Sequence, residues 1–242
     1  GVDTDVSPYD SGSYASSTAY LTGMAAVKAS KSMIRLITEK GAEYLEKTPE
    51  EVEFDGERVM AKDGSAAISL KDIGNRAMAN NGKALEVTES HSSPVSPPPF
   101  MVGMAEIEMD QETCDFELVN YVAVVDCGTP INPAIARVQT EGGLGQGIGM
   151  AMFEDVTRSE KGQVYENSFM QYKLPTRVDV GNIRVEFESS YEPTGPFGVK
   201  SIGEVVINTP SPAIAAAVAN ATGVQIRELP ITPEKIFKEL HK

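Results

Sequence analysis

A glycine-rich segment between residues 139 and 151 constrains the fold of this chain most strongly. Asn132 followed by Pro133 is a typical helix start, and the residues after them continue in a helical pattern. Glycines occupy positions 143, 145, 147 and 149, and each costs about 1 kcal/mol against alanine inside a helix. The physical reason for so many glycines is close approach, either of another helix or of a bulky ligand.

The segment does not follow a nucleotide-binding or membrane pattern. The glycine spacing fails the GxGxxG fingerprint in every frame. Glu141 and Gln146 make the apolar part too short and too polar to span a membrane. Gln139 and Gln146 can present side-chain amides to a polar heterocycle. The alternative is close helix packing with both glutamines in solvent.

Glu204 is a carboxylate in an apolar setting. The stretch Gly198–Ile207 places aliphatic residues on both sides of it and a glycine immediately before it. Such a stretch is expected in the interior, where an ionised carboxylate needs a partner or has its pKa raised. Gly203 allows backbone or ligand to approach closely. This pattern is typical of a general base. The alternatives are a glutamate that caps the next helix or one that pairs with Lys200.

The amino-terminal segment Asp3–Thr18 is rich in small and hydroxylated residues and leads into a helical pattern. Such a helix start offers amide donors, hydroxyls and the positive end of the helix dipole together. This favours a phosphate or another anionic ligand, although neither the P-loop nor the dinucleotide pattern is present. The alternative is ordinary N-capping by one hydroxyl, from Ser13, Ser16, Ser17 or Thr18.

Together these segments resemble the carboxy-terminal part of the molybdenum-binding subunit of the xanthine dehydrogenase/aldehyde oxidase family. Asp3–Gly23 is similar to the family's loop and helix start beside the pterin. Asp126–Pro133 with Gln139–Gly149 is similar to its glutamine- and glycine-rich helix. Tyr172–Thr176 resembles its Tyr-Lys-Ile-Pro segment, and Lys200–Glu204 its Lys-x-x-Gly-Glu motif. The motifs follow the family's order over nearly the whole chain, and the bacterial nicotinate and purine hydroxylase type is the most similar.

The resemblance implies an oxidoreductase, a molybdenum hydroxylase that oxidatively hydroxylates an N-heterocycle with water as the oxygen source. Glu204 is then the catalytic base, and Lys200 and Gln139 hydrogen-bond the pterin. The other implied cofactor-binding positions are Ala15, Ser16, Ser17, Thr18 and Gly203. No side chain is expected to ligate the metal, because molybdenum comes ligated by molybdopterin. The bacterial type implies the cytosine dinucleotide form of that cofactor.

Partners are implied as well. The chain opens on Gly1–Asp3, already inside a motif, and the family's substrate-orienting half is expected on an N-terminal half or a companion molybdenum subunit. Iron–sulfur and FAD subunits would take up the electrons, and no activity is expected without them. Val205–Val206 stand where the family usually has two prolines. The alternatives are an aldehyde-oxidising member, which shares every motif, and a cofactor-free scaffold or assembly subunit.

Composition is consistent with a soluble enzyme piece. The formal net charge of −14 disfavours nucleic acid and membrane as partners. Cys114 and Cys127 are expected to be buried free thiols of a reducing cytoplasm, and two cysteines cannot hold an iron–sulfur cluster. Neither that cluster nor a flavin is expected on this chain. His91 and His241 form no recognisable metal motif, and no secretory leader is visible.

The expected fold class is α+β, with mixed sheets and packed helices as in the C-terminal half of a molybdenum hydroxylase large subunit. Residues 1–92 are expected to form a long helix, over about 16–47 with Gly41 as a candidate break, and a small α+β accessory module. That module should contain a hairpin with a type I′ turn at Asp55–Gly56. Residues 93–99 form a proline-rich connector. Residues 100–242 form the α+β cofactor-binding domain that carries Glu204, with strands over 100–110, 114–126, near Val164 and over 183–188.

Overall fold

The computed structural model describes residues 3–242 and divides into two compact units. The smaller unit is Leu21–Pro94, and the larger unit joins the residues up to Tyr20 to Val95–Lys242. The sequence-based division placed the first twenty residues with the long helix, whereas the structure places them with the carboxy-terminal part. The reason is a set of hydrogen bonds between the amino-terminal loop and residues 201–204, described below.

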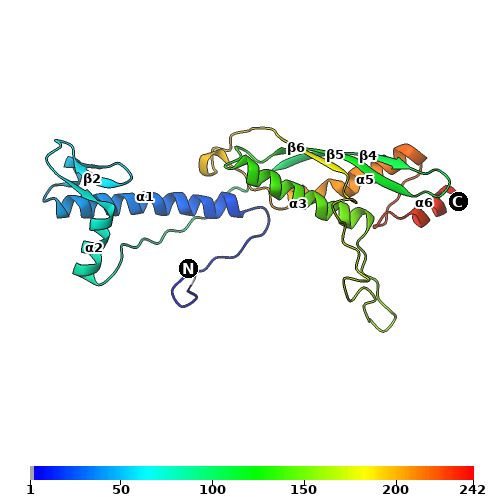
Figure 1. Ribbon diagram of the computed structural model, residues 1–242, viewed down its shortest axis with the longest axis horizontal. Coiled ribbons are helices and arrows are strands. Elements are labelled where there is room, and N and C mark those ends of the chain that lie inside the picture. The colour runs from blue at the N-terminus through cyan, green and yellow to red at the C-terminus, as the bar shows by residue number, and fades with distance from the viewer. Residues whose placement is uncertain (1–2) are drawn as a thin grey trace. The chain divides into compact units, whose positions relative to one another are not determined.

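The smaller unit packs a helix and a small sheet around one core (Figure 1). Its elements are α1 (Thr18–Tyr44, which begins in the larger unit), η1 (Pro49–Glu51), β1 (Val52–Phe54), β2 (Arg58–Ala61), β3 (Ala67–Ser69) and α2 (Leu70–Asn81). The strands form an antiparallel sheet in the order β1-β2-β3. The helix α1 continues through Gly41, because a glycine there lets the helix backbone lie against the buried Val59.

Local signals set the boundaries of α2 and of the hairpin. The Ser69 hydroxyl accepts a hydrogen bond from the Asp72 amide, and Gly82 ends the helix in the left-handed conformation at φ 64°. The predicted hairpin is present, but its turn type was wrong. Asp55 and Arg58 flank the turn, and Gly56 alone of these residues has a positive φ. The two central residues of the turn are therefore Gly56 and Glu57. The Asp55 carboxylate stabilises this turn by accepting hydrogen bonds from the amides of Glu57 and Arg58.

The larger unit is a mixed sheet covered by helices (Figure 1). Its elements are β4 (Phe100–Met109), β5 (Phe116–Asp126), α3 (Pro133–Met152), β6 (Asn182–Phe187), η2 (Pro196–Gly198), α4 (Val205–Asn208), α5 (Pro210–Thr222) and α6 (Pro233–Leu240). The strand β5 pairs antiparallel with β4 and parallel with β6. Because parallel neighbours need a crossover, the glycine-rich helix α3 lies in the β5–β6 connection.

One hydrophobic core holds the larger unit together. The helices α3 and α5 pack on the same side of the sheet (Figure 1). Their contribution includes Leu144, Ile148 and Ile214, which are fully buried with Tyr121 and Val125 of β5. At roughly 1.5–3 kcal/mol for each large apolar side chain removed from water, this core fixes the end of β5, where Asp126 lies. The predicted α+β architecture is therefore present.

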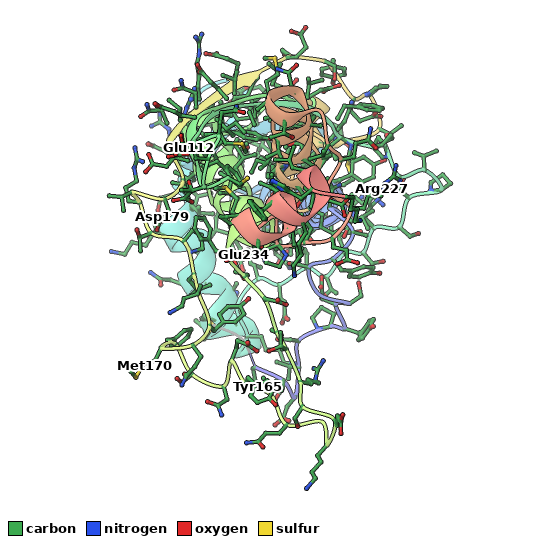
Figure 2. All side chains as sticks on the ribbon, turned by 90° about the vertical axis from the view of Figure 1, so that its right-hand side faces the viewer. Glu112, Tyr165, Met170, Asp179, Arg227 and Glu234 are labelled. Carbon is green, nitrogen blue, oxygen red and sulfur yellow. The ribbon has the colours of Figure 1, made fainter. Side chains whose placement is uncertain are left out.

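The predicted strand near Val164 was wrong. Only a single bridge joins Arg158 and Val164, within a long segment between α3 and β6. Tyr165 and Met170 lie on this segment where it extends away from the sheet (Figure 2). A single pair of short segments without further neighbouring strands is marginally stable, so the residues near Val164 do not form a strand. Within residues 3–242, no helix combines the length and apolar character needed to cross a bilayer.

Candidate functional site

A groove of about 500 Å³ lies in the larger unit and brings together three segments that are far apart in the sequence. The amino-terminal loop, the first half of α3 and the loop before α4 each contribute to it. It is lined by Ser13, Tyr14, Ser16, Ser17, Thr18, Ala19, Gln139, Ser201, Ile202, Gly203 and Glu204. Six of the eight predicted site residues are therefore in one groove, and Ala15 contacts Glu204 directly. Lys200 is the exception.

Glu204 is held by the amino-terminal loop through two hydrogen bonds. The Ala15 amide donates to Glu204 Oε1 at 3.0 Å, and the Glu204 amide donates to Ser16 Oγ at 2.8 Å. Ala15 and Ser16 adopt left-handed backbone conformations, at φ 51° and 50°. Two consecutive non-glycine residues in that region are uncommon and cost on the order of 1–3 kcal/mol each. Backbone strain of this kind, aimed at one carboxylate, is typical of a functional site.

The expectation that Glu204 is buried was wrong. Glu204 and Gly203 are exposed, whereas Val199 and Val206 on either side are buried. The apolar run keeps its aliphatic side chains in the core and turns outward where Glu204 precedes α4. Glu204 occupies the N-cap position of α4 but its side chain makes no capping hydrogen bond. An added Cβ on Gly203 would lie 3.9 Å from Ser16, so among the described residues nothing approaches Gly203 closely.

The start of α1 supplies the polar wall of the groove. Ser17 Oγ donates to the Tyr14 carbonyl at 2.6 Å, which closes the loop just before the helix begins at Thr18. The first turn of α1 contains no acidic residue. The positive end of the helix dipole therefore faces the groove without a local carboxylate to neutralise it, which favours an anionic group there. The Tyr20 amide donates to Ser201 Oγ at 3.1 Å and joins this wall to the loop before α4.

The glycines of α3 divide into two groups. An added Cβ on Gly143 would lie 2.1 Å from Val206 Cγ2, and one on Gly147 would lie 2.6 Å from Pro210 Cγ. These glycines let α3 approach α4 and the start of α5. Gly142 and Gly145 have no described atom within 4 Å of such a Cβ. Beside these two groups, an added Cβ on Gly149 would lie 2.1 Å from Glu154 Oε1 and 3.0 Å from Pro175 Cδ. Packing against α4 and α5 therefore explains two of the five glycines, and the space beside Gly142 and Gly145 is open among the described residues.

Gln139 and Gln146 differ in where they lie. Gln139 lines the groove, on the same helix that Asn132 caps by accepting from the Ile135 amide at 3.2 Å. Gln146 is exposed and lies outside the lining. Gln139 alone of the two can present its amide to a ligand that also touches Glu204.

Lys200 is absent from the lining of the groove, although the next residue, Ser201, belongs to it. The Lys200 ammonium is buried and pairs with Asp126 Oδ2 at 2.9 Å, with the Phe100 ring 5.4 Å away. Partial burial by itself would raise the pKa of Asp126, but hydrogen bonds from Ser190, Lys200 and the Gly128 amide outweigh it and lower that pKa. The pairing of Lys200 with Glu204 that the sequence left open is therefore absent, and a direct hydrogen bond from Lys200 to a pterin stays a prediction.

Several groove residues were not predicted. Ser201 and Ile202 stand inside the Lys200–Glu204 motif, and Ser13 and Tyr14 precede the predicted loop residues, so adjacency was the available signal. No signal marked the Asp126–Lys200 pair, because its members are 74 residues apart. The Tyr172–Thr176 segment lies elsewhere: the Tyr172 hydroxyl donates to Glu154, beyond the end of α3.

The described residues hold no cluster of three or more His, Cys, Asp or Glu side chains suited to a metal ion. Cys114 and Cys127 are free and buried, as predicted. The groove instead fits a polar organic ligand with an anionic group. Its volume lies within the range of small-molecule sites, and it offers hydroxyls, one amide side chain and a helix start.

Comparison with known proteins supports this assignment. Residues 1–181 match the family described as the molybdopterin cofactor-binding domain. The chain is 32% identical over 242 residues to the probable hypoxanthine oxidase XdhD of Escherichia coli (strain K12), covering 99% of this chain and 25% of that protein. It is also 32% identical over 244 residues to the 6-hydroxypseudooxynicotine dehydrogenase complex subunit gamma of Paenarthrobacter nicotinovorans, covering 97% and 31%.

The fold agrees with these relatives. The crystal structure of quinoline 2-oxidoreductase from Pseudomonas putida 86 superposes with a TM-score of 0.82 at 27% identity, over 98% of this chain and 32% of that one. This confirms the predicted α+β class. The chain therefore belongs to the molybdopterin-binding subunits of the xanthine dehydrogenase family. It spans about a quarter to a third of the length of the relatives it matches.

Proposed function

We propose that this chain supplies the catalytic base and one wall of the cofactor site of a molybdenum hydroxylase. The observation that carries the proposal is that the amino-terminal loop fixes Glu204 through two hydrogen bonds. Its carboxylate lies in the same groove as Gln139 and the start of α1, and a strained loop fixes its orientation. A scaffold subunit has no need for such a carboxylate, which favours the enzyme over that alternative.

The cofactor's place follows from the chemistry of the groove walls. Ser16, Ser17 and Thr18 present hydroxyls and amides where the helix dipole favours an anionic group, and Gln139 presents a donor and an acceptor from α3. Gly203 leaves room beside Glu204, since no described side chain fills the space there. When bound, the molybdenum that molybdopterin ligates would supply the two-electron oxidising centre that this chain's side chains lack.

The role of Glu204 is to accept a proton. Its Oε1 is occupied by the Ala15 amide at 3.0 Å, and Oε2 has no hydrogen-bond partner among residues 3–242. Oε2 is therefore the atom that takes the proton from the attacking oxygen, which we propose originates from water. The Ala15 hydrogen bond keeps the carboxylate from rotating, so that Oε2 stays directed toward the substrate. General-base catalysis of this kind contributes roughly 100- to 10,000-fold in rate.

The proposed substrate is a small electron-poor N-heterocycle. Support comes from relatives named for hypoxanthine, for a nicotine derivative and for quinoline. The relatives are three to four times longer than this chain, so we propose that the remainder of a molybdenum subunit forms the facing wall and orients the substrate. Separate iron–sulfur and FAD subunits would carry the electrons away. The buried free thiols support a reducing, cytoplasmic setting.

The test is to isolate the intact complex that contains this chain and to measure its metal and its product. We expect about one molybdenum per copy, with cytidine monophosphate released on hydrolysis of the cofactor. Turnover of a panel of purines, nicotinate, quinoline and aldehydes in ¹⁸O-labelled water should give a heterocyclic product that carries ¹⁸O. Absence of molybdenum from the freshly isolated complex would contradict the proposal. Turnover of aldehydes alone would replace the proposed substrate class.

A further inference from the structure

Asp126 and Lys200 form an ion pair in which Lys200 is buried, Asp126 is half-buried and each carboxylate oxygen is used. Asp126 Oδ2 accepts from the Lys200 ammonium at 2.9 Å, and Oδ1 accepts from Ser190 Oγ at 2.6 Å and from the Gly128 amide at 2.9 Å. Lys200 is only 9% exposed. A buried ion pair contributes little net stability compared with apolar residues of the same size. What it does provide is a single defined geometry between the two segments that it joins.

The backbone reinforces this junction. The Lys200 amide donates to the Cys127 carbonyl at 2.7 Å, and the Thr129 amide donates to the Gly198 carbonyl at 2.8 Å. Gly128 has φ +69°, and a Cβ on it would lie 2.3 Å from the Gly198 carbonyl oxygen. The loop before α4 therefore lies directly against the end of β5, whose position the hydrophobic core fixes.

The same loop is fixed again a few residues later. The Ser201 hydroxyl accepts from the Tyr20 amide, and Glu204 makes its two hydrogen bonds with Ala15 and Ser16. Between these points Gly203 makes no close contact with any described residue. The position of Glu204 therefore depends on anchors on both sides of Gly203. One is the amino-terminal loop, and the other is the Asp126–Lys200 pair.

We propose that Asp126 is a positioning residue for Glu204, acting through Lys200, whose ammonium it holds in a fixed place. Lys200 then serves as the rigid end of the loop that carries the base. The inference rests on the proposed role of Glu204. It assigns to Asp126 and Ser190 an effect on the chemical step, although neither lines the groove.

The test uses the complete molybdenum-loaded complex and four variants: Asp126→Asn, Glu204→Gln, the double variant, and Glu186→Gln. The last removes an exposed ion pair with Arg184 on β6 and serves as the matched control. The rate of enzyme reduction by substrate in a single turnover reports the chemical step, beside KM and molybdenum content. Asp126→Asn should lower that rate about 10- to 100-fold, since a displacement of about 1 Å can cost 100-fold, with KM and molybdenum content unchanged.

The double variant separates positioning from general damage. If Asp126 acts through Glu204, then Asp126→Asn should have no further effect once Glu204 is glutamine. Equal losses in both backgrounds would overturn the proposal, as would a wild-type rate in Asp126→Asn. A wild-type rate in Glu204→Gln would instead refute the role of Glu204 and the inference with it. If Asp126→Asn fails to fold, Ser190→Ala carries the test. It keeps both charges and should lower the rate about 2- to 10-fold, again only when Glu204 is present, and an unchanged rate there would also overturn the proposal.

Discussion

Replacing Gly143 by alanine should expose the link between helix packing and the position of Glu204. The new Cβ would lie 2.1 Å from Val206 Cγ2 and 2.9 Å from Val206 Cβ. Carbon atoms need about 3.5–4.0 Å, so α3 and α4 must separate by more than 1 Å. Val206 is fully buried and belongs to α4, which begins directly after Glu204. Because the Val206 side chain cannot rotate into solvent, α4 itself must move, and Glu204 moves with it.

The expected change in the free energy of unfolding follows from two opposed effects. Alanine in place of glycine stabilises a helix by about 1 kcal/mol, whereas forced overpacking of a core costs typically 1–3 kcal/mol. Gly142→Ala is the matched control, because nothing lies within 4 Å of its added Cβ. The difference in unfolding free energy between the two variants therefore isolates the packing effect, at about 1–3 kcal/mol. For a chain of this size that corresponds to roughly 2–12 °C in melting temperature.

Thermal and urea unfolding of the 242-residue chain, followed by far-ultraviolet circular dichroism, measures this difference. We expect Gly142→Ala to be at least as stable as wild type and Gly143→Ala to be clearly less stable than Gly142→Ala. In the complete complex, Gly143→Ala should also lower turnover, because its displacement moves Glu204. Equal stability of the two variants would refute the packing explanation of Gly143 and the coupling of α3 to α4.

Three further predictions follow from the same structure. The chain produced alone should bind little molybdopterin, because its groove has one wall and leaves much of the ligand in water; stoichiometric cofactor by metal analysis would contradict this. The pKa of Asp126 is lowered from its ordinary value of 3.8. The ionised carboxylate therefore stabilises the fold above pH 3.8, and this contribution is lost as the pH falls through the lowered pKa. As the pH is lowered below about 5, the urea midpoint of Asp126→Asn should fall less steeply than that of the wild type. Cys114 and Cys127 are both buried, and burial raises the pKa of the Cys127 thiol. Both cysteines should therefore react with a thiol reagent only after unfolding, and rapid labelling of the native chain would count against their burial.

Short-range signals in the sequence predicted the start of the glycine-rich helix. Asn132 with Pro133 begins α3, and the Asn132 side chain caps it. This start depends on a few neighbouring residues, whose preferences act locally. The predicted helix break at Gly41 was wrong. Glycine is a poor helix former, but here it permits close contact between the helix and Val59, eighteen positions further along the chain.

The composition of the candidate site was largely predictable, but its geometry was not. The motifs identified Glu204, Gln139 and the serine-rich loop, which the structure gathers in one groove. The exposure of Glu204 and the Asp126–Lys200 pair depend on contacts between segments that are distant in the sequence. The glycine pattern of α3 likewise could not say which glycines face a helix and which face open space, because helical periodicity does not identify the neighbour.

The central claim is that Glu204 is the catalytic base. Replacing it by glutamine in the complete complex conserves the shape of the side chain and keeps an oxygen that can accept from the Ala15 amide, while removing the ionisable group. The single-turnover rate of enzyme reduction by an N-heterocyclic substrate, at full molybdenum content, tests the claim most directly. The account predicts a fall of about 100- to 10,000-fold with unchanged melting temperature. A rate near that of the wild type in the molybdenum-replete variant would contradict it.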